Sequence, residues 1–188
     1  MKLYAFLCLL FFYNVYADYT PLDIAYELKE ASIKHNIDKR VLYTIAKIES
    51  GFNPLIISFV SKSTKYQFNQ LTKQVSNYKN QYLIVFKGSE KYLKEALKIL
   101  LQDKELKIDV GLMQINSTNF KEDEIDKIFN LSYNIDKSSK ILKSCIAIKT
   151  TLKDSIECYN KGTRKIKKYN YFNKFKNSYL KDFSNIND

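Results

Sequence analysis

The sequence predicts a single, mainly α-helical domain that carries a small β-hairpin or strand insertion. The chain has 188 residues, enough for one domain with one hydrophobic core that needs neither a metal nor a dense disulfide scaffold. Its composition, 45% hydrophobic and 27% charged, is that of a soluble globular protein. With 4 Gly and 2 Pro, it lacks the turn residues that an all-β sandwich or barrel requires.

Residues 1–17 have the pattern of a secretory signal peptide. Lys2 precedes an apolar run from Leu3 to Tyr13, and Ala17 supplies the small residue before the cleavage site. A bilayer span takes about 20 apolar residues, so the run is too short for one; an uncleaved anchor is the alternative. We expect a mature domain of residues 18–188 that is exported to the periplasm and keeps no membrane span.

Several segments place apolar residues at the spacing of a buried helix face. Asp38 is a good N-cap for the second of them, and Gly51 followed by Pro54 stops it. The apolar run before Gly88 is the best strand candidate and indicates a small hairpin. The predicted helices are 23–35, 38–50, 92–101, 122–130, 137–150 and 154–160, the predicted strand is 81–87, and the aromatic tail from Lys165 onward forms one more docked helix.

Glu49 lies on the apolar side of the second predicted helix, in its last turn. The helix C-terminus disfavours a carboxylate by about 0.3–1 kcal/mol, which raises a pKa by at most about 0.7 units. Burial must supply any further shift, and Ile48, Phe52 and Met113 are candidates for an apolar wall. A carboxyl that stays protonated near neutral pH suits general-acid cleavage of a glycosidic bond. From this segment alone, a surface glutamate is the more common case.

The net charge of +11 suggests an anionic partner. Export argues against nucleic acid, and the lysines are scattered along the chain apart from a cluster at 164–168. We therefore expect attraction to an anionic cell-wall polymer or membrane surface at most. Most of the excess of lysine over acidic residues is expected to lie on solvated faces, where it serves solubility. Neither a metal site nor a cofactor is expected, because phosphate-binding loops and metal-ligand spacings are missing. His35, the single histidine, is expected at the surface end of a helix.

Cys145 and Cys158 remain after removal of Cys8 with the signal peptide. In an oxidising compartment an isolated pair favours a disulfide over a metal site, since zinc usually takes four ligands and only His35 could help. Closing so short a loop stabilises a protein by about 3 kcal/mol on the chain-entropy model. Two buried free thiols are the alternative.

Three segments in order resemble the signatures of the family 1 lytic transglycosylases, which have the goose-type lysozyme-like fold. They are residues 49–54 (ESGFNP), 111–116 (GLMQIN) and 158–162 (CYNKG). Three ordered matches are far more specific than one, and the likeness extends over roughly residues 23–179. The resemblance implies an α+β lysozyme-like fold.

The resemblance also implies roles for single residues. Glu49 inherits the position of the catalytic acid and base, Gln114 that of a sugar-binding amide, and Tyr159 that of a tyrosine beside the catalytic carboxyl. Ser58 stands nine residues after the glutamate, as in the family, although the following segment departs from the pattern. The substrate-binding residues expected on this basis are Ser58, Met113, Gln114, Asn116, Tyr159 and Asn160.

The implied reaction is cleavage of the β-1,4 bond between N-acetylmuramic acid and N-acetylglucosamine in peptidoglycan, with a 1,6-anhydro product. An ordinary glycosidase uses a second carboxylate. Asp109 is the residue to suspect if the enzyme hydrolyses instead, although a cap or turn aspartate is its expected role. Two alternatives stay open: a lysozyme-like hydrolase and a peptidoglycan-binding subunit without activity.

The sequence departs from typical relatives between the first two segments, where residues 55–109 form an insertion. A longer connection with a helix, followed by GLMQIN and a cysteine beside the Tyr-Asn pair, resembles the transglycosylases of type IV secretion and conjugation systems. The insertion could wall the substrate groove, contact such a machine or have no role.

Overall fold

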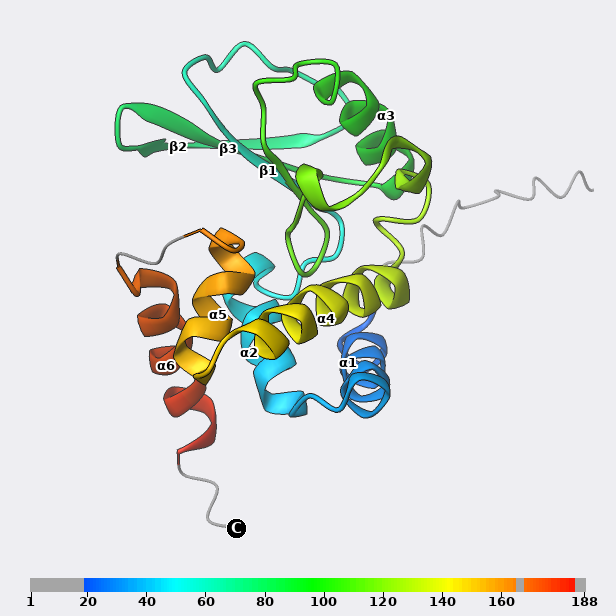
Figure 1. The fold of residues 1–188 in the computed structure, drawn as a ribbon. Coiled ribbons are helices and arrows are strands. Elements are labelled where there is room, and N and C mark those ends of the chain that lie inside the picture. Colours follow the sequence, from blue (N-terminus) through cyan, green and yellow to red (C-terminus); the bar gives the residue numbers. More distant parts are fainter. Residues whose placement is uncertain (1–18, 165–167, 185–188) are drawn as a thin grey trace, which may run out of the picture.

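The computed structural model describes residues 19–164 and 168–184, which form a helical body beside a five-stranded antiparallel sheet (Figure 1). The arrangement is a single α+β, lysozyme-like domain, so the predicted fold class is confirmed. The predicted signal peptide lies outside the described residues. Within these residues, no helix has the length and apolar content to cross a bilayer.

Helices α1 (Pro21–His35) and α2 (Lys39–Ser50) begin at side-chain caps and match two predicted helices. Thr20 and Asp23 form a capping box, in which each side chain accepts the backbone N–H of the other residue. Asp38 accepts the N–H of Arg40 at 2.8 Å. Gly51 ends α2 in the left-handed conformation, with φ of 62°.

The sheet has the strand order β2-β3-β1-β4-β5, with every neighbouring pair antiparallel. The predicted strand is confirmed as β3 (Gln81–Lys87), which forms a hairpin with β2 (Thr72–Tyr78). The central strand β1 (Ile56–Ser61) was not predicted, because it is buried on both faces and lacks the alternation of a half-exposed strand. The strands β4 (Ile108–Val110) and β5 (Ile115–Asn116) complete the sheet.

Helix α3 (Glu90–Leu100) follows the hairpin and packs against the sheet beside β1 (Figure 1). Its apolar face, with Leu93 and Leu97 fully buried, belongs to the same hydrophobic core as Phe59 and Phe86. Residues 55–109 therefore contain β1, β2, β3, α3 and the start of β4, and they build most of the sheet. Whether they are an insertion relative to other proteins stays a prediction.

The helical body consists of α1, α2 and three later helices, which lie below the sheet in Figure 1. They are α4 (Leu131–Ile148), α5 (Leu152–Lys161) and α6 (Asn170–Phe183). Helix α4 contacts α1 and α5, while α6 contacts α2 and α5. The predicted docked tail helix is confirmed as α6, whose Phe175 is buried.

The predicted helix at 122–130 is wrong. This segment has one 3-10 turn at Glu122–Glu124 and then irregular turns, although Ile125, Ile128 and Phe129 are buried. Buried residues three apart fit consecutive turns as well as an α-helix, so the spacing misled the prediction. Asn130 then caps α4 by accepting the N–H of Tyr133 at 3.0 Å.

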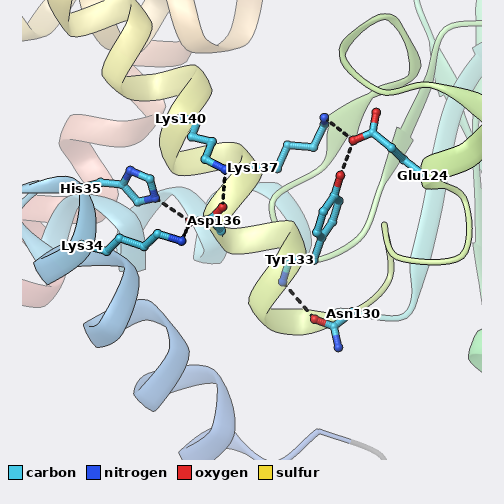
Figure 2. A network of polar contacts seen from close by, with 8 residues as sticks. All are labelled: Lys34, His35, Glu124, Asn130, Tyr133, Asp136, Lys137 and Lys140. Carbon is cyan, nitrogen blue, oxygen red and sulfur yellow. Dashed lines mark hydrogen bonds and ion pairs between the residues drawn. The ribbon is translucent and has the colours of Figure 1, made fainter.

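Two clusters of charged side chains fix α4 against its neighbours (Figure 2). Asp136 binds Lys34, His35 and Lys140, each at 2.7 Å, and so ties α4 to the end of α1. In the second cluster, Glu124, from the 3-10 turn before α4, accepts hydrogen bonds from Lys137 and Tyr133 on α4. His35 was expected at the surface and is instead 7% exposed, because its ring turns inward to meet Asp136.

Candidate active site

Glu49 lies in the last turn of α2, where the chain turns sharply into the sheet. The turn is held by its own polar groups: the N–H of Asn53 donates to Ser50 Oγ at 3.1 Å, and Asn53 Oδ1 accepts the N–H of Leu55 at 2.9 Å. Gly51 has φ of 62°, which costs glycine nothing. The segment ESGFNP is thus a tight turn held by hydrogen bonds within the segment, and it determines where Glu49 lies at the end of α2.

The carboxyl group of Glu49 is partly exposed to a groove and otherwise enclosed by protein. Burial raises its pKa from 4.5 to about 7. The Tyr171 hydroxyl opposes this shift by donating a 2.5 Å hydrogen bond to Oε1, while the charge of Asp109 raises the pKa further and Lys174 lowers it. Glu49 is therefore populated in both protonation states near neutral pH.

The side chains expected to wall Glu49 do not line the groove. Met113 is fully buried in the core, and its predicted contact with substrate stays a prediction. Phe52 packs on Tyr43, with ring centroids 4.8 Å apart, and Ile48 packs against the core. Two tyrosines lie at the carboxyl: Tyr171 binds it directly, and Tyr159 lines the groove with it.

The pairing of three strands brings Ser58, Asp109 and Asn116 into one row. Ser58 on β1 is opposite Asp109 on β4, and Asp109 is opposite Asn116 on β5. Residues paired across neighbouring antiparallel strands present their side chains to the same face of a sheet. That face carries the polar wall of the groove opposite the helices, because Asp109 and Asn116 both line it.

Gln114 is held in place by two hydrogen bonds of its own amide. Its Nε2 donates to the carbonyl of Gly111 at 2.9 Å, and its Oε1 accepts from Ser58 Oγ at 2.6 Å. Ser58 thereby orients Gln114, and its own predicted contact with substrate stays a prediction. The loop that carries Gln114 is fixed from α4 by Asn134, which accepts the N–H of Met113 at 2.8 Å.

Only glycine fits at the start of this loop. Gly111 has φ of +79°, and a Cβ there would lie 2.3 Å from Asn134 Nδ2. Asn134 cannot move away, since it also donates to the carbonyls of Val110 and Ile128. The second signature segment is therefore a fixed platform that presents Gln114 to the groove.

Tyr159 is a support for this platform. Its hydroxyl donates to the Met113 carbonyl at 2.8 Å and is 2.8 Å from Ser138 Oγ on α4. Burial, together with the nearby Glu49 charge, raises the pKa of Tyr159, so the phenol stays protonated. Its ring closes one side of the groove next to Glu49.

Asp109 lies in the candidate site, contrary to its expected role as a cap or turn residue. It is part of β4, and its Oδ1 accepts from Asn116 Nδ2 at 2.8 Å. Burial raises its pKa from 3.8 to about 6, which the hydrogen bond from Asn116 partly offsets. At pH 7 Asp109 is thus mostly ionised beside a partly protonated Glu49.

A disulfide joins Cys145 on α4 to Cys158 on α5. The pairing matches the expected one, and both residues line the groove. Because Cys158 immediately precedes Tyr159, the bond fixes the helix that carries Tyr159 and Asn160.

The groove between the helices and the sheet has a volume of about 700 Å³. It gathers Glu49, Gln114, Asn116, Tyr159 and Asn160 from the predicted site residues, whereas half-buried Ser58 and fully buried Met113 are not among its lining residues. Within residues 19–164 and 168–184, no cluster of His, Cys, Asp and Glu is arranged to hold a metal ion. The remaining lining residues are Lys107, Asp109, Ile115, Thr118, Asn119, Ile141, Ser144, Cys145, Ile148, Cys158, Lys161, Gly162, Thr163 and Arg164.

Tyr171 is the residue with direct contact to Glu49 that the sequence analysis did not assign. It lies 122 positions along the chain from Glu49 and reaches it because α6 packs on α2 and α5. The aromatic tail indicated a docked helix, but nothing in that pattern identified which of its tyrosines faces the site.

The sequence profile of the Transglycosylase SLT domain family matches residues 27–181, which include every candidate site residue named above. Comparisons with curated proteins and with solved structures found no match.

Proposed function

The chain belongs to the transglycosylase SLT domain family, and on that premise we propose that it cleaves the β-1,4 bond between N-acetylmuramic acid and N-acetylglucosamine. The observation that carries the proposal is the Glu49 carboxyl, held at the groove with a pKa of about 7. An acid poised near the working pH can both give up and recover a proton in one catalytic cycle.

The reaction needs one carboxyl group in two successive states. Protonated Glu49 donates its proton to the glycosidic oxygen, the bond to the anomeric carbon of N-acetylmuramic acid breaks, and positive charge develops on that carbon. Ionised Glu49 then removes the proton from the C6 hydroxyl of the same sugar, whose oxygen bonds to the anomeric carbon. The product is a 1,6-anhydro ring, no water is consumed, and Glu49 regains its proton.

Amide side chains along the groove are placed to bind the sugars. Gln114, Asn116 and Asn160 project from the loop, the sheet and α5, and each line the groove. Amides can both donate to and accept from hydroxyl and acetamido groups, so they suit an amino-sugar polymer. Tyr159 supports the loop from behind while its ring contributes an apolar surface.

Product masses test the proposal. Purified peptidoglycan incubated with the mature protein should release muropeptides about 18 Da lighter than the reducing forms, the mass of one water, because the bond is broken without hydrolysis. Mass spectrometry of the soluble fraction measures this directly. Reducing products would overturn the transglycosylase assignment, and no release would favour a binding subunit without activity.

A lysozyme-like hydrolase is the second candidate, and the position of Asp109 favours it. Its carboxylate lies in the same groove as Glu49 and its charge acts on Glu49. Inverting and retaining glycosidases use such a second carboxylate to activate water or stabilise the developing charge.

We expect Asp109→Asn to shift the pH dependence of cleavage and to leave the anhydro products unchanged. The ionised Asp109 raises the pKa of Glu49, so its removal lowers that pKa, and activity is lost at lower pH on the basic side of the profile. Initial rates of muropeptide release between pH 5 and pH 9 provide the measurement, at about half-unit steps. Asp126→Asn, which removes an exposed carboxylate outside the groove, is the matched control.

If the variant lost all activity and the wild type gave reducing ends, Asp109 would be the water-activating residue of a hydrolase. A pure binding subunit is the third possibility. It is disfavoured because such a protein gains nothing from a carboxyl group whose pKa burial has raised to about 7.

We further propose that the protein is exported to the periplasm and opens the wall locally for a type IV secretion or conjugation machine. The signal-peptide pattern of residues 1–17 and the long connection between the first two signature segments support this setting. In the producing bacterium, loss of secretion or conjugation on deletion of the gene, restored by wild type but not by Glu49→Gln, would test it.

A further inference from the structure

Glu157 is a fully buried carboxyl group that the proposed reaction does not use. It lies on α5, is 0% exposed and faces α6. Its Oε1 accepts the backbone N–H of Phe172 at 2.9 Å. Its Oε2 is 2.7 Å from Lys161 Nζ in an ion pair, without a well-directed hydrogen bond.

Burial of a carboxylate is unfavourable until its partners compensate, and a well-packed apolar residue often stabilises a fold equally well. Stability alone is therefore a weak explanation for a charged residue at this position. What distinguishes the position is the backbone group that Glu157 binds.

Glu157 binds the first turn of α6, a helix whose own N-cap residue makes no side-chain capping hydrogen bond. A helix begins with N–H groups that lack partners inside the helix, and a side chain at the N-cap usually binds one of them. Tyr169, at the N-cap of α6, makes no such bond. Glu157 supplies the missing acceptor from α5, and its negative charge suits the positive end of the helix.

Lys161 ties down the segment just before this turn. Besides its ion pair with Glu157, its Nζ donates to the carbonyl of Lys168. The pair of side chains on α5 thus holds the chain at Lys168 and again at Phe172.

The turn that is fixed in this way carries Tyr171, whose hydroxyl binds Glu49. Tyr171 is the neighbour of Phe172, and its hydroxyl reaches Glu49 Oε1 at 2.5 Å. A hydrogen bond between two oxygens forms only over a narrow range of distances, about 2.5–3.0 Å, so it depends on the position of its donor. Release of the first turn of α6 would lengthen the bond before it disturbed the rest of the core.

We propose that Glu157 is a positioning residue for catalysis: it caps the first turn of α6 so that the Tyr171 hydroxyl stays bonded to Glu49. The inference rests on the proposed transglycosylase function of the same site.

The effect on pH dependence has a definite direction. The bond from Tyr171 lowers the pKa of Glu49, so its loss raises that pKa. The other groups that act on Glu49 are Asp109 on β4 and Lys174 on α6, with Tyr159 on α5 coupled to its charge. Among the described residues, Glu157 forms its hydrogen bond and ion pair with Phe172 and Lys161, and with none of these three. A rise in the pKa of Glu49 after mutation of Glu157 therefore reports on Tyr171.

The experiment compares Glu157→Ala, Tyr171→Phe and the double variant with wild type. Removal of either group should move the basic limb of the activity profile to higher pH by about one unit, the worth of one lost charge-assisted hydrogen bond. The double variant should match Tyr171→Phe alone, because both changes break the same bond. Glu157→Gln keeps an acceptor oxygen for Phe172 and should keep the wild-type limb.

Asp182→Asn is the matched control. It removes the 2.6 Å ion pair of α6 with Lys47 at the far end of the helix and leaves the first turn alone. We expect it to lower the melting temperature without moving the pH limb. If Glu157→Ala likewise lowered the melting temperature but left the limb in place, or if its effect added to that of Tyr171→Phe, Glu157 would be a structural residue only.

NMR titration of isotope-labelled glutamate side chains measures the pKa of Glu49 without turnover. It separates failure of this inference from failure of the proposed function, because the pKa of Glu49 can be compared between wild type and Glu157→Ala even if the protein releases no muropeptides. An unchanged Glu49 titration in that variant overturns the positioning role.

Discussion

Replacement of Glu49 by glutamine is expected to reduce muropeptide release by about 10³-fold or more, because one carboxyl group performs both proton transfers. Glutamine keeps the size of the side chain and can still accept the Tyr171 hydrogen bond, but it cannot donate a proton to the glycosidic oxygen. Rates of soluble muropeptide release from purified peptidoglycan, followed by mass spectrometry, measure the loss.

The stability of the Glu49→Gln variant should not fall with its activity, and above pH 7 it should equal or exceed that of wild type. The pKa of Glu49 is about 7 in the folded protein and about 4.5 when unfolded, so its contribution to stability is complete below pH 4.5 and is lost as the pH rises through 7. Glutamine removes this pH-dependent cost. Melting temperatures of variant and wild type should therefore be close at pH 4, and the variant should be at least as stable at pH 8.

Glu30→Gln, on the exposed face of α1, is the control and should change neither activity nor stability. A large fall in the melting temperature of Glu49→Gln at every pH would assign Glu49 to the fold instead of the reaction. Residual activity within about tenfold of wild type would require another proton donor in the groove.

The local part of the site could be predicted from the sequence, since it depends on residues close together in the chain. Asp38, Gly51 and Pro54 determine where α2 begins and ends, and they place Glu49 in its last turn. The two cysteines lie 13 positions apart, on adjoining helices.

The remaining part depends on pairing between distant segments. Strand β1 shows no alternation because both of its faces are covered, so the row of Ser58, Asp109 and Asn116 could not be foreseen. Tyr171 reaches Glu49 only through the packing of α6 on α2, which the helical pattern of the tail does not specify. A signature segment likewise does not specify which of its side chains faces the groove: Met113 belongs to one, and its side chain is buried in the core.

Loss of the disulfide has the second large expected effect, this time on stability. Cys145→Ser should lower the free energy of unfolding by about 3 kcal/mol under oxidising conditions, which corresponds to a fall of about 10 °C in melting temperature for a domain of this size. Thermal unfolding with and without dithiothreitol measures it. Reduced wild type, Cys145→Ser and the double variant Cys145→Ser/Cys158→Ser should have the same melting temperature. Equal melting temperatures of oxidised wild type and Cys145→Ser would show that the disulfide contributes nothing to stability.

Activity should survive this change far better than it survives Glu49→Gln. Helix α5 keeps a second link to α4 through Ser138 and the Tyr159 hydroxyl, and that hydroxyl continues to hold the Met113 carbonyl. Below the melting temperature of the reduced protein, the Gln114 platform therefore stays in place, and we expect release rates within about tenfold of wild type. A complete loss of activity in a reduced but folded protein would mean that the disulfide itself shapes the groove that it lines.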